Sequence, residues 1–150
     1  MAMTQHQDAP DTPARLRALP TRLLAKASAQ ADRVVTAGLA AADAGKWHYA
    51  VLVALDDGGP ASQAELSRRT GIYRSDMVAV LNALAGRDLI ERAADPADRR
   101  RNVITLTPSG RAFTARLDLL VAELQDEALA PLAPAEREQL TRLLRRLAER

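Results

Sequence analysis

The sequence predicts a mainly helical fold of the α+β class, in which helices surround one short β-hairpin. Apolar residues recur three or four residues apart along most of the chain after residue 20, which is the spacing of helices. The period changes to that of strands only around the polar stretch 95–101. The 150 residues are 47% hydrophobic but only 3% aromatic, a composition that suits one core of closely packed helices.

The first thirteen residues are polar and contain Pro10 and Pro13 without an apolar core. They predict a disordered leader (1–13) and not an export signal, which leaves a single domain over residues 14–150. The longest apolar run, Tyr49–Leu55, is too short to cross a bilayer. We therefore expect a cytoplasmic protein without a membrane partner.

The residue types exclude several kinds of chemistry. Cysteine is absent, which removes disulfides and thiolate metal sites. His6 lies in the polar leader and leaves only His48 as an imidazole ligand, so no metal site is expected. No Ser/His/Asp set and no glycine-rich phosphate loop is recognisable. The sequence predicts no enzyme and no cofactor.

Two helices are predicted before residue 60. A long one begins at Pro20, and Gly45 is expected to end it. The second runs from Lys46 to about Leu55 and stops before the breaker cluster 56–60. The long helix carries an apolar stripe, formed by Leu23, Leu24, Ala27, Ala31, Val34 and Val35.

A helix-turn-helix follows. Ser62 and Glu65 have the pattern of a capping box, in which the hydroxyl accepts from the Glu65 amide and the carboxylate reaches back to Ser62. The short helix that they start ends at Gly71, which can take a left-handed conformation. The next helix begins near Tyr73 and runs to about Ala85. Two helices joined by a tight glycine turn are typical of this motif.

Two strands are predicted at 89–93 and 102–107, joined by a polar turn that holds three consecutive arginines. With the preceding motif they form a winged helix-turn-helix over residues 46–107. Thr107 and Pro108 then begin another helix, and a last one follows Pro134.

The flanking segments 14–45 and 108–150 carry leucine-rich stripes with no obvious place to be buried in a lone domain. We expect them to be dimerisation helices, which makes the protein a homodimer. Charge supports a polyanionic partner: residues 66–111 hold nine Arg against five Asp and Glu, an excess of +4, whereas the whole chain carries +2. The remainder is therefore acidic.

Double-stranded DNA fits this pattern. The second helix of the motif has the width of the major groove, and the hairpin tip can reach the adjacent minor groove. Asp98 is expected to fix the direction of the Arg100 side chain. The arginine run could also be a merely solvated turn, and the arginines of the first helix merely a solvated helix end. The predicted DNA contacts are Arg68, Arg69, Arg74, Ser75, Asp76, Ala79, Asn82, Asp98, Arg99, Arg100 and Arg101.

The run from Tyr49 to Gly110 resembles the MarR family of transcription regulators. The segments that carry the resemblance are Val51-Leu52, Gln63–Leu66, Gly71-Ile72, Leu89–Arg92, Asp95–Arg100 and Leu106–Gly110. By position, Asp98 and Arg100 match the wing residues that reach the minor groove in this family. Tyr73 departs from the family's usual helix cap, and Asp88 stands in the usual glycine place after the recognition helix.

The resemblance implies a homodimer with interlocked terminal helices on a palindromic operator, acting as a ligand-responsive repressor. Many members bind small aromatic or phenolic effectors in a cleft between the dimer helices and the DNA-binding lobe. Trp47, His48 and Tyr49 are the candidate effector contacts, with ordinary packing as the alternative. Two other functions remain open: a winged-helix protein-interaction module without specific DNA binding, and a PadR-like regulator.

Overall fold

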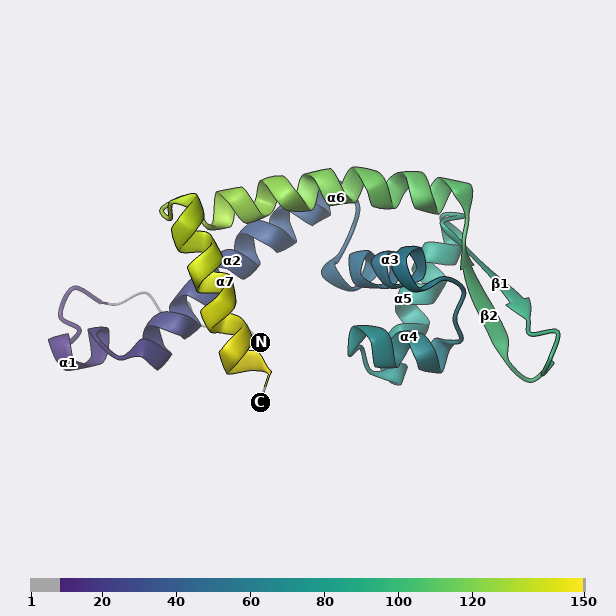
Figure 1. The fold of residues 1–150 in the computed structure, drawn as a ribbon, viewed down its shortest axis with the longest axis horizontal. Helices are drawn as coiled ribbons and strands as arrows, with labels where there is room; N and C mark the ends of the chain where they lie inside the picture. The colour runs from purple at the N-terminus through teal and green to yellow at the C-terminus, as the bar shows by residue number, and fades with distance from the viewer. Residues whose placement is uncertain (1–8, 150) are drawn as a thin grey trace. The chain divides into compact units, whose positions relative to one another are not determined.

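The structure is a computed structural model and describes residues 9–149, so residues 1–8 of the expected leader lie outside it. It divides into two compact units, a central one comprising Thr36–Glu123 and an outer one comprising the described parts of Met1–Val35 and Leu124–Arg150. The elements follow in the order α1 (Ala14–Arg17), α2 (Pro20–Ala41), α3 (Lys46–Gly58), α4 (Gln63–Thr70), α5 (Arg74–Gly86), β1 (Ile90–Ala94), β2 (Asn102–Leu106), α6 (Pro108–Ala128) and α7 (Pro134–Ala148) (Figure 1). The predicted mainly helical α+β class is confirmed.

The end of α2 differs from the expectation that Gly45 closes this helix. The helix ends at Ala41, and Asp43 takes the left-handed conformation at φ 55°. The Ala44 N–H donates to the Leu39 carbonyl at 2.9 Å, and the Asp43 N–H donates to the Ala40 carbonyl at 3.0 Å. This is a Schellman motif, which an aspartate can complete because its short side chain tolerates that backbone.

Gly45 instead begins the next helix, where it precedes α3 in an extended conformation. Its N–H donates to His48 Nδ1 at 3.0 Å, so the imidazole caps the start of α3. At the other end α3 continues three residues past the predicted Leu55, to Gly58, and stops where Gly59 has φ 73°. A helix of this length presents Val51, Leu52 and Leu55 to the core.

Only half of the predicted capping box is present at the start of α4. Ser62 Oγ accepts from the Glu65 N–H at 3.2 Å, as expected. The Glu65 carboxylate does not reach back to Ser62, because it pairs with the guanidinium of Arg101 at 3.2 Å. Gly71 ends the helix with φ 75°, the left-handed conformation predicted for it.

The recognition helix α5 starts and ends within a residue of its predicted bounds. Tyr73 precedes it without a side-chain cap. After Gly86 the chain ends α5 with the same Schellman motif that ends α2. Asp88 has φ 57°, and the Leu89 N–H donates to the Leu84 carbonyl at 3.1 Å. Asp88 thus takes the conformation that a glycine would supply in this place.

The hairpin pairs β1 with β2 in antiparallel register, with Ile90 opposite Leu106 and Arg92 opposite Ile104. Ala61 forms an isolated antiparallel bridge with Ile104 of β2. Its N–H donates to the Ile104 carbonyl at 3.1 Å, and its carbonyl accepts from the Ile104 N–H at 2.8 Å. The sheet is therefore bonded to the segment before α4, and Figure 1 shows the two long arrows leaving the helices of the central unit.

One hydroxyl joins the base of the hairpin to the start of α6. Thr107 Oγ1 accepts from the Gly110 N–H at 2.9 Å, which is the predicted cap, and donates to the Asp88 carbonyl at 2.6 Å. Gly110 is buried, and a Cβ placed on it would lie 2.0 Å from the Leu89 carbonyl oxygen. The hairpin and helix approach this closely only because residue 110 is a glycine.

The core of the central unit is aliphatic. Large side chains from α2, α3, α4, α5, β2 and α6 are less than 2% exposed, namely Leu39, Leu52, Leu66, Met77, Leu81, Leu84, Ile104 and Leu117. Burial of one such side chain contributes about 1.5–3 kcal/mol to folding. The helices α3, α4 and α5 are thereby held in fixed relation to the hairpin, which is what a recognition surface requires.

The outer unit has a different character. Neither α1 nor α7 contains a buried residue. Several of its large apolar side chains are between 39% and 52% exposed, namely Leu16, Leu19, Leu23, Leu24, Leu143, Leu144 and Leu147. Within this unit Arg137 joins the helices, because it donates to Asp126 Oδ1 at 2.7 Å and to the Leu132 carbonyl at 3.0 Å. In residues 9–149 no helix combines the length and the apolar character needed to cross a membrane.

Candidate DNA-binding surface

The exposed face of α5 carries the side chains that the sequence assigned to DNA. Arg74, Ser75, Ala79 and Asn82 are exposed, and Asp76 is half-buried near the start of the helix. The opposite face is anchored in the core by Met77, Val80, Leu81 and Leu84, none more than 5% exposed. Because these anchors lie at helical spacing, the exposed set forms one continuous stripe.

One residue of this surface escaped the sequence analysis. Arg92, on β1, donates from Nη2 to Oδ1 of Asn82 at 2.7 Å. Both side chains are exposed. Strand alternation places Arg92 on the same face of the hairpin as the buried Ile90. No local pattern in the sequence indicates that Asn82 is its partner.

The hairpin tip is a compact turn closed by its own backbone. The Asp95 N–H donates to the Arg101 carbonyl at 2.7 Å, and the Arg101 N–H donates to the Asp98 carbonyl at 3.0 Å. Asp98 does not orient the Arg100 side chain as expected: its Oδ1 accepts from the backbone N–H of Arg100 at 3.0 Å. This short side chain sits two residues away, within reach of the N–H, and so it forms an Asx-type turn.

The three arginines of the tip therefore have different environments. Among the described residues, Arg99 and Arg100 have no hydrogen bond or ion pair from the guanidinium, and both are exposed. Arg101 is tied to Glu65 of α4 at 3.2 Å. Two cations at the tip are thus free to meet a ligand, while the third fixes the hairpin to the helix-turn-helix.

Arg68 and Arg69 also differ in the partners of their side chains. Arg68 is exposed at the end of α4. Arg69 Nη1 donates to the Gly59 carbonyl at 3.2 Å and to the Ala54 carbonyl at 3.5 Å, and its Nη2 lies 3.8 Å from Glu65. These carbonyls belong to the end of α3, so Arg69 closes that helix. The Arg69 guanidinium is therefore engaged within the central unit and is less available to a phosphate than that of Arg68.

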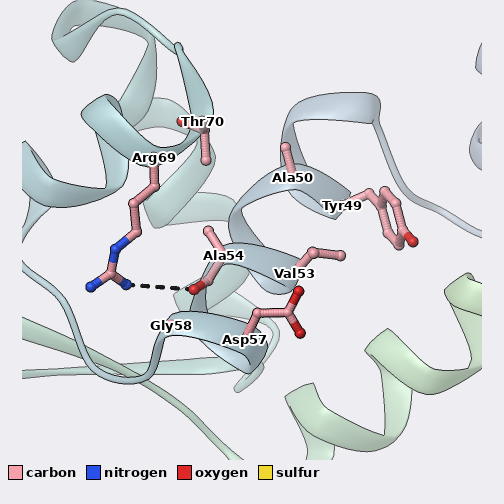
Figure 2. A pocket seen from close by; sticks show the side chains of 8 residues that line it. All are labelled: Tyr49, Ala50, Val53, Ala54, Asp57, Gly58, Arg69 and Thr70. Atoms are coloured by element: carbon pink, nitrogen blue, oxygen red, sulfur yellow. Dashed lines mark hydrogen bonds between the residues drawn. The ribbon is translucent and has the colours of Figure 1, made fainter. Parts of the chain in front are cut away.

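An open depression of about 580 Å³ lies beside α3 and α4 (Figure 2). Figure 2 shows the Arg69 guanidinium directed at the Ala54 carbonyl on one side and the Tyr49 ring on the other. Asp57 and Thr70 complete its polar lining. Arg69 bonds to backbone carbonyls, Tyr49 to Asp118 and Thr70 to the Leu66 carbonyl, so these three polar groups of the lining are already engaged.

The three candidate effector residues differ in what holds them. Trp47 is 51% exposed and so is not a core anchor. The Tyr49 hydroxyl donates to Asp118 Oδ1 at 2.6 Å, and burial together with this carboxylate raises the pKa of Tyr49 to about 12. Burial, and next the positive charge of Arg87, lower the pKa of His48 below its usual value. A neutral imidazole matches its task of accepting from Gly45.

A second cationic group in the central unit was missed as well. The guanidinium of Arg87 lies 4.8 Å from the ring centre of Phe113, and that of Arg116 lies 5.5 Å from the same ring. Arg87 also donates to the Asp43 carbonyl. In the described part of the chain no three His, Asp or Glu side chains gather as a metal site would require.

These elements define a winged helix-turn-helix protein, with a recognition helix exposed beside an arginine-tipped hairpin. A family model described as the MarR family matches residues 42–101, which span this motif up to the hairpin tip. The transcriptional repressor CouR, solved bound to a 23-mer DNA duplex, is 32% identical, with a TM-score of 0.81 over 90% of this chain and 96% of CouR. The chain belongs to the MarR family, which decides against the PadR-like alternative.

Two further relatives connect the chain to regulation. The transcriptional repressor NicR of Pseudomonas putida is 31% identical over 101 residues, which are 67% of this chain. The chain matches 64% of the length of NicR, which is less than two thirds. BpsR of Bordetella bronchiseptica, whose DNA binding is regulated by 6-hydroxynicotinic acid, is 28% identical with a TM-score of 0.80 over 92% of this chain and 99% of BpsR. The family consists of transcription regulators, in agreement with the prediction that the chain is not an enzyme.

Proposed function

We propose that this protein is a sequence-specific DNA-binding repressor that acts in the cytoplasm as a homodimer on a palindromic operator. One observation carries the proposal: α5 exposes a stripe of hydrogen-bonding side chains beside a hairpin tip where Arg99 and Arg100 are unengaged among the described residues. A rigid helix and an adjacent cationic tip match a major groove and the minor groove next to it. The DNA-bound relative CouR supports this function.

The side chains of α5 divide the work by chemistry. Arg74 can pair with guanine or with a phosphate, and Ser75 and Asn82 can donate to bases or to the backbone. Ala79 can meet a thymine methyl group. Asp76 can accept from a cytosine amine or hold Arg74. Arg68, at the end of α4, is proposed as a phosphate contact that positions the protein without reading sequence.

Binding to the DNA upstream of the protein's own gene tests the proposal. The purified protein should retard this fragment at concentrations where a scrambled duplex of the same length stays free, since specific affinities exceed non-specific ones by about 10³-fold or more. Equal affinity for both duplexes over a range of salt concentrations would instead favour the protein-interaction module.

We expect a stable dimer at micromolar concentration. The exposed leucines of the outer unit would leave a large apolar surface in water, and a second copy can cover it. Light scattering in moderate salt measures the mass. Leu143→Glu combined with Leu147→Glu should yield monomers with weaker operator binding, whereas Val78→Glu, which charges an equally exposed apolar residue of α5, should leave the mass dimeric. A monomeric parent protein would contradict this.

We also expect a small aromatic or phenolic effector to weaken DNA binding, with Trp47, His48 and Tyr49 among its contacts. Aromatic acids such as 6-hydroxynicotinic acid, which regulates the relative BpsR, are the first probes. The ratio of operator affinities with and without the probe should move toward one in His48→Ala. Thermal unfolding of the variant is followed in parallel, because His48 also caps α3. The same ratio in variant and parent would remove His48 from the effector site.

A further inference from the structure

We propose that Arg92 is a specificity-determining residue, which positions Asn82 so that the two side chains together read guanine in preference to adenine. The inference rests on the proposed DNA-binding function and concerns one position of the recognition helix. Its basis is the bond at 2.7 Å between Arg92 Nη2 and Asn82 Oδ1.

The chemistry of the two groups fixes the orientation of the amide. A guanidinium has five N–H donors and no acceptor, so the atom of Asn82 that faces Arg92 is its oxygen. The amide nitrogen then points away from Arg92. Asparagine ordinarily pairs with adenine through both atoms, accepting from N6 and donating to N7. Arg92 occupies the oxygen that this pairing needs.

The pair presents donors on its outer side. Those donors are the N–H groups of Asn82 and the unengaged N–H groups of Arg92. Guanine offers two acceptors, N7 and O6, on its major-groove edge, and a guanidinium is the commonest group that binds them. Adenine offers N7 but also the N6 amine, whose hydrogens would face a cation. The base that suits the pair is therefore guanine.

The fold holds Arg92 in this place. Residues directly opposite each other in an antiparallel pair project to the same face, so Arg92 shares the face of Ile104, which is 1% exposed. Leu81 of α5, Arg92 and Ile104 line one groove of about 330 Å³. Arg92 thus borders this groove, and its guanidinium reaches Asn82 on α5.

The pair contributes little to folding, because both side chains are exposed and water competes for the bond. On DNA the same bond is shielded from water, and a hydrogen bond gains strength in such surroundings. The hydrogen bond between Arg92 and Asn82 is therefore expected to affect the choice of base more than the stability of the fold.

The test measures affinities for a set of operator duplexes in which each base pair is replaced in turn. Asn82→Ala identifies the base pair that Asn82 reads, because discrimination disappears there. At this pair the parent should prefer guanine to adenine by about tenfold, within the usual range for a well-placed pair of contacts. In Arg92→Ala the preference should vanish or pass to adenine, since the free amide can then pair with both atoms.

Three further variants separate this effect from lost charge or lost folding. Arg92→Lys keeps a donor and a charge, so it should retain part of the guanine preference. Arg92→Met keeps a long unbranched side chain at the groove, and it should behave as Arg92→Ala. Arg99→Ala removes an equivalent charge from the hairpin tip, and it should weaken binding to guanine and adenine duplexes equally. Thermal unfolding is recorded for each variant.

Three results would overturn the inference while leaving the proposed function intact. They are an unchanged guanine-to-adenine ratio in Arg92→Ala and Arg92→Met, an adenine preference in the parent, or Asn82→Ala without effect on any base pair. A parent protein that does not distinguish operator from scrambled DNA would overturn the proposed function itself.

Discussion

Replacing Arg100 by alanine is expected to weaken operator binding by about 1–3 kcal/mol, the scale of a specific groove contact. The side chain stands at the hairpin tip without a hydrogen bond or ion pair among the described residues. It has no bond to another described residue to give up when it enters a minor groove, where negative potential is concentrated. The plot of log affinity against log salt should also become shallower by about 0.9 for each phosphate no longer neutralised.

Two matched variants show whether the effect belongs to the groove. Asp98→Ala should cause part of the same loss, because Asp98 Oδ1 holds the N–H of Arg100 and so shapes the turn. Arg68→Ala should lower affinity for operator and scrambled duplexes alike. Salt titrations of both duplexes measure all three variants. If Arg100→Ala binds operator like the parent, with the same salt slope, the hairpin tip does not contact DNA.

Gly110→Ala is expected to cost about 3 kcal/mol of unfolding free energy, at the upper end of what overpacking usually costs. The added Cβ would lie 2.0 Å from the Leu89 carbonyl oxygen and 2.9 Å from Leu106 Cδ1. The first of these is backbone, and the same oxygen accepts from the Thr107 N–H at 3.1 Å. Relief of the clash therefore displaces the base of the hairpin.

Gly86→Ala is the matched control. A Cβ at Gly86, the last residue of α5, meets nothing within 4 Å. Alanine there should leave stability unchanged or raise it by up to about 1 kcal/mol, through the better helix propensity of alanine. Urea denaturation of both variants gives the comparison. Equal midpoints for Gly110→Ala and the parent would show that the hairpin base yields more easily than its geometry indicates.

Features that depend on neighbouring residues could be predicted from the sequence. The left-handed Gly71, the Ser62 cap and the Thr107 cap were each expected, and each depends on a few consecutive backbone groups. The wrong prediction that Gly45 ends α2 also has a local cause. Glycine is the usual residue in a Schellman motif, but Asp43 adopts its conformation two residues before Gly45.

The partners of the charged side chains could not be predicted, because they are chosen by packing. Arg69 and Arg100 both stand in runs of arginines in the sequence. The Arg69 side chain bonds to carbonyls at the end of α3, whereas the Arg100 guanidinium is exposed without a partner in the described part of the chain. Glu65 carries the local pattern of a capping box, but the hairpin brings Arg101 within 3.2 Å of it. Long side chains select among such neighbours only once the strands and helices are in place.

The bonds at Thr107 also bear on how accurately the tip of the hairpin is placed. This hydroxyl bonds the end of β2 to the Asp88 carbonyl and to the first turn of α6, and the Ala61–Ile104 and Arg101–Glu65 bonds attach the hairpin at two further points. Each strand has five residues and so extends about 17 Å from the base of the hairpin. A rotation of about 10° at the base would carry the tip roughly 3 Å, the length of a hydrogen bond. A small rotation at the base is thus enlarged along the strands, and the three attachments of the hairpin limit the displacement of its tip.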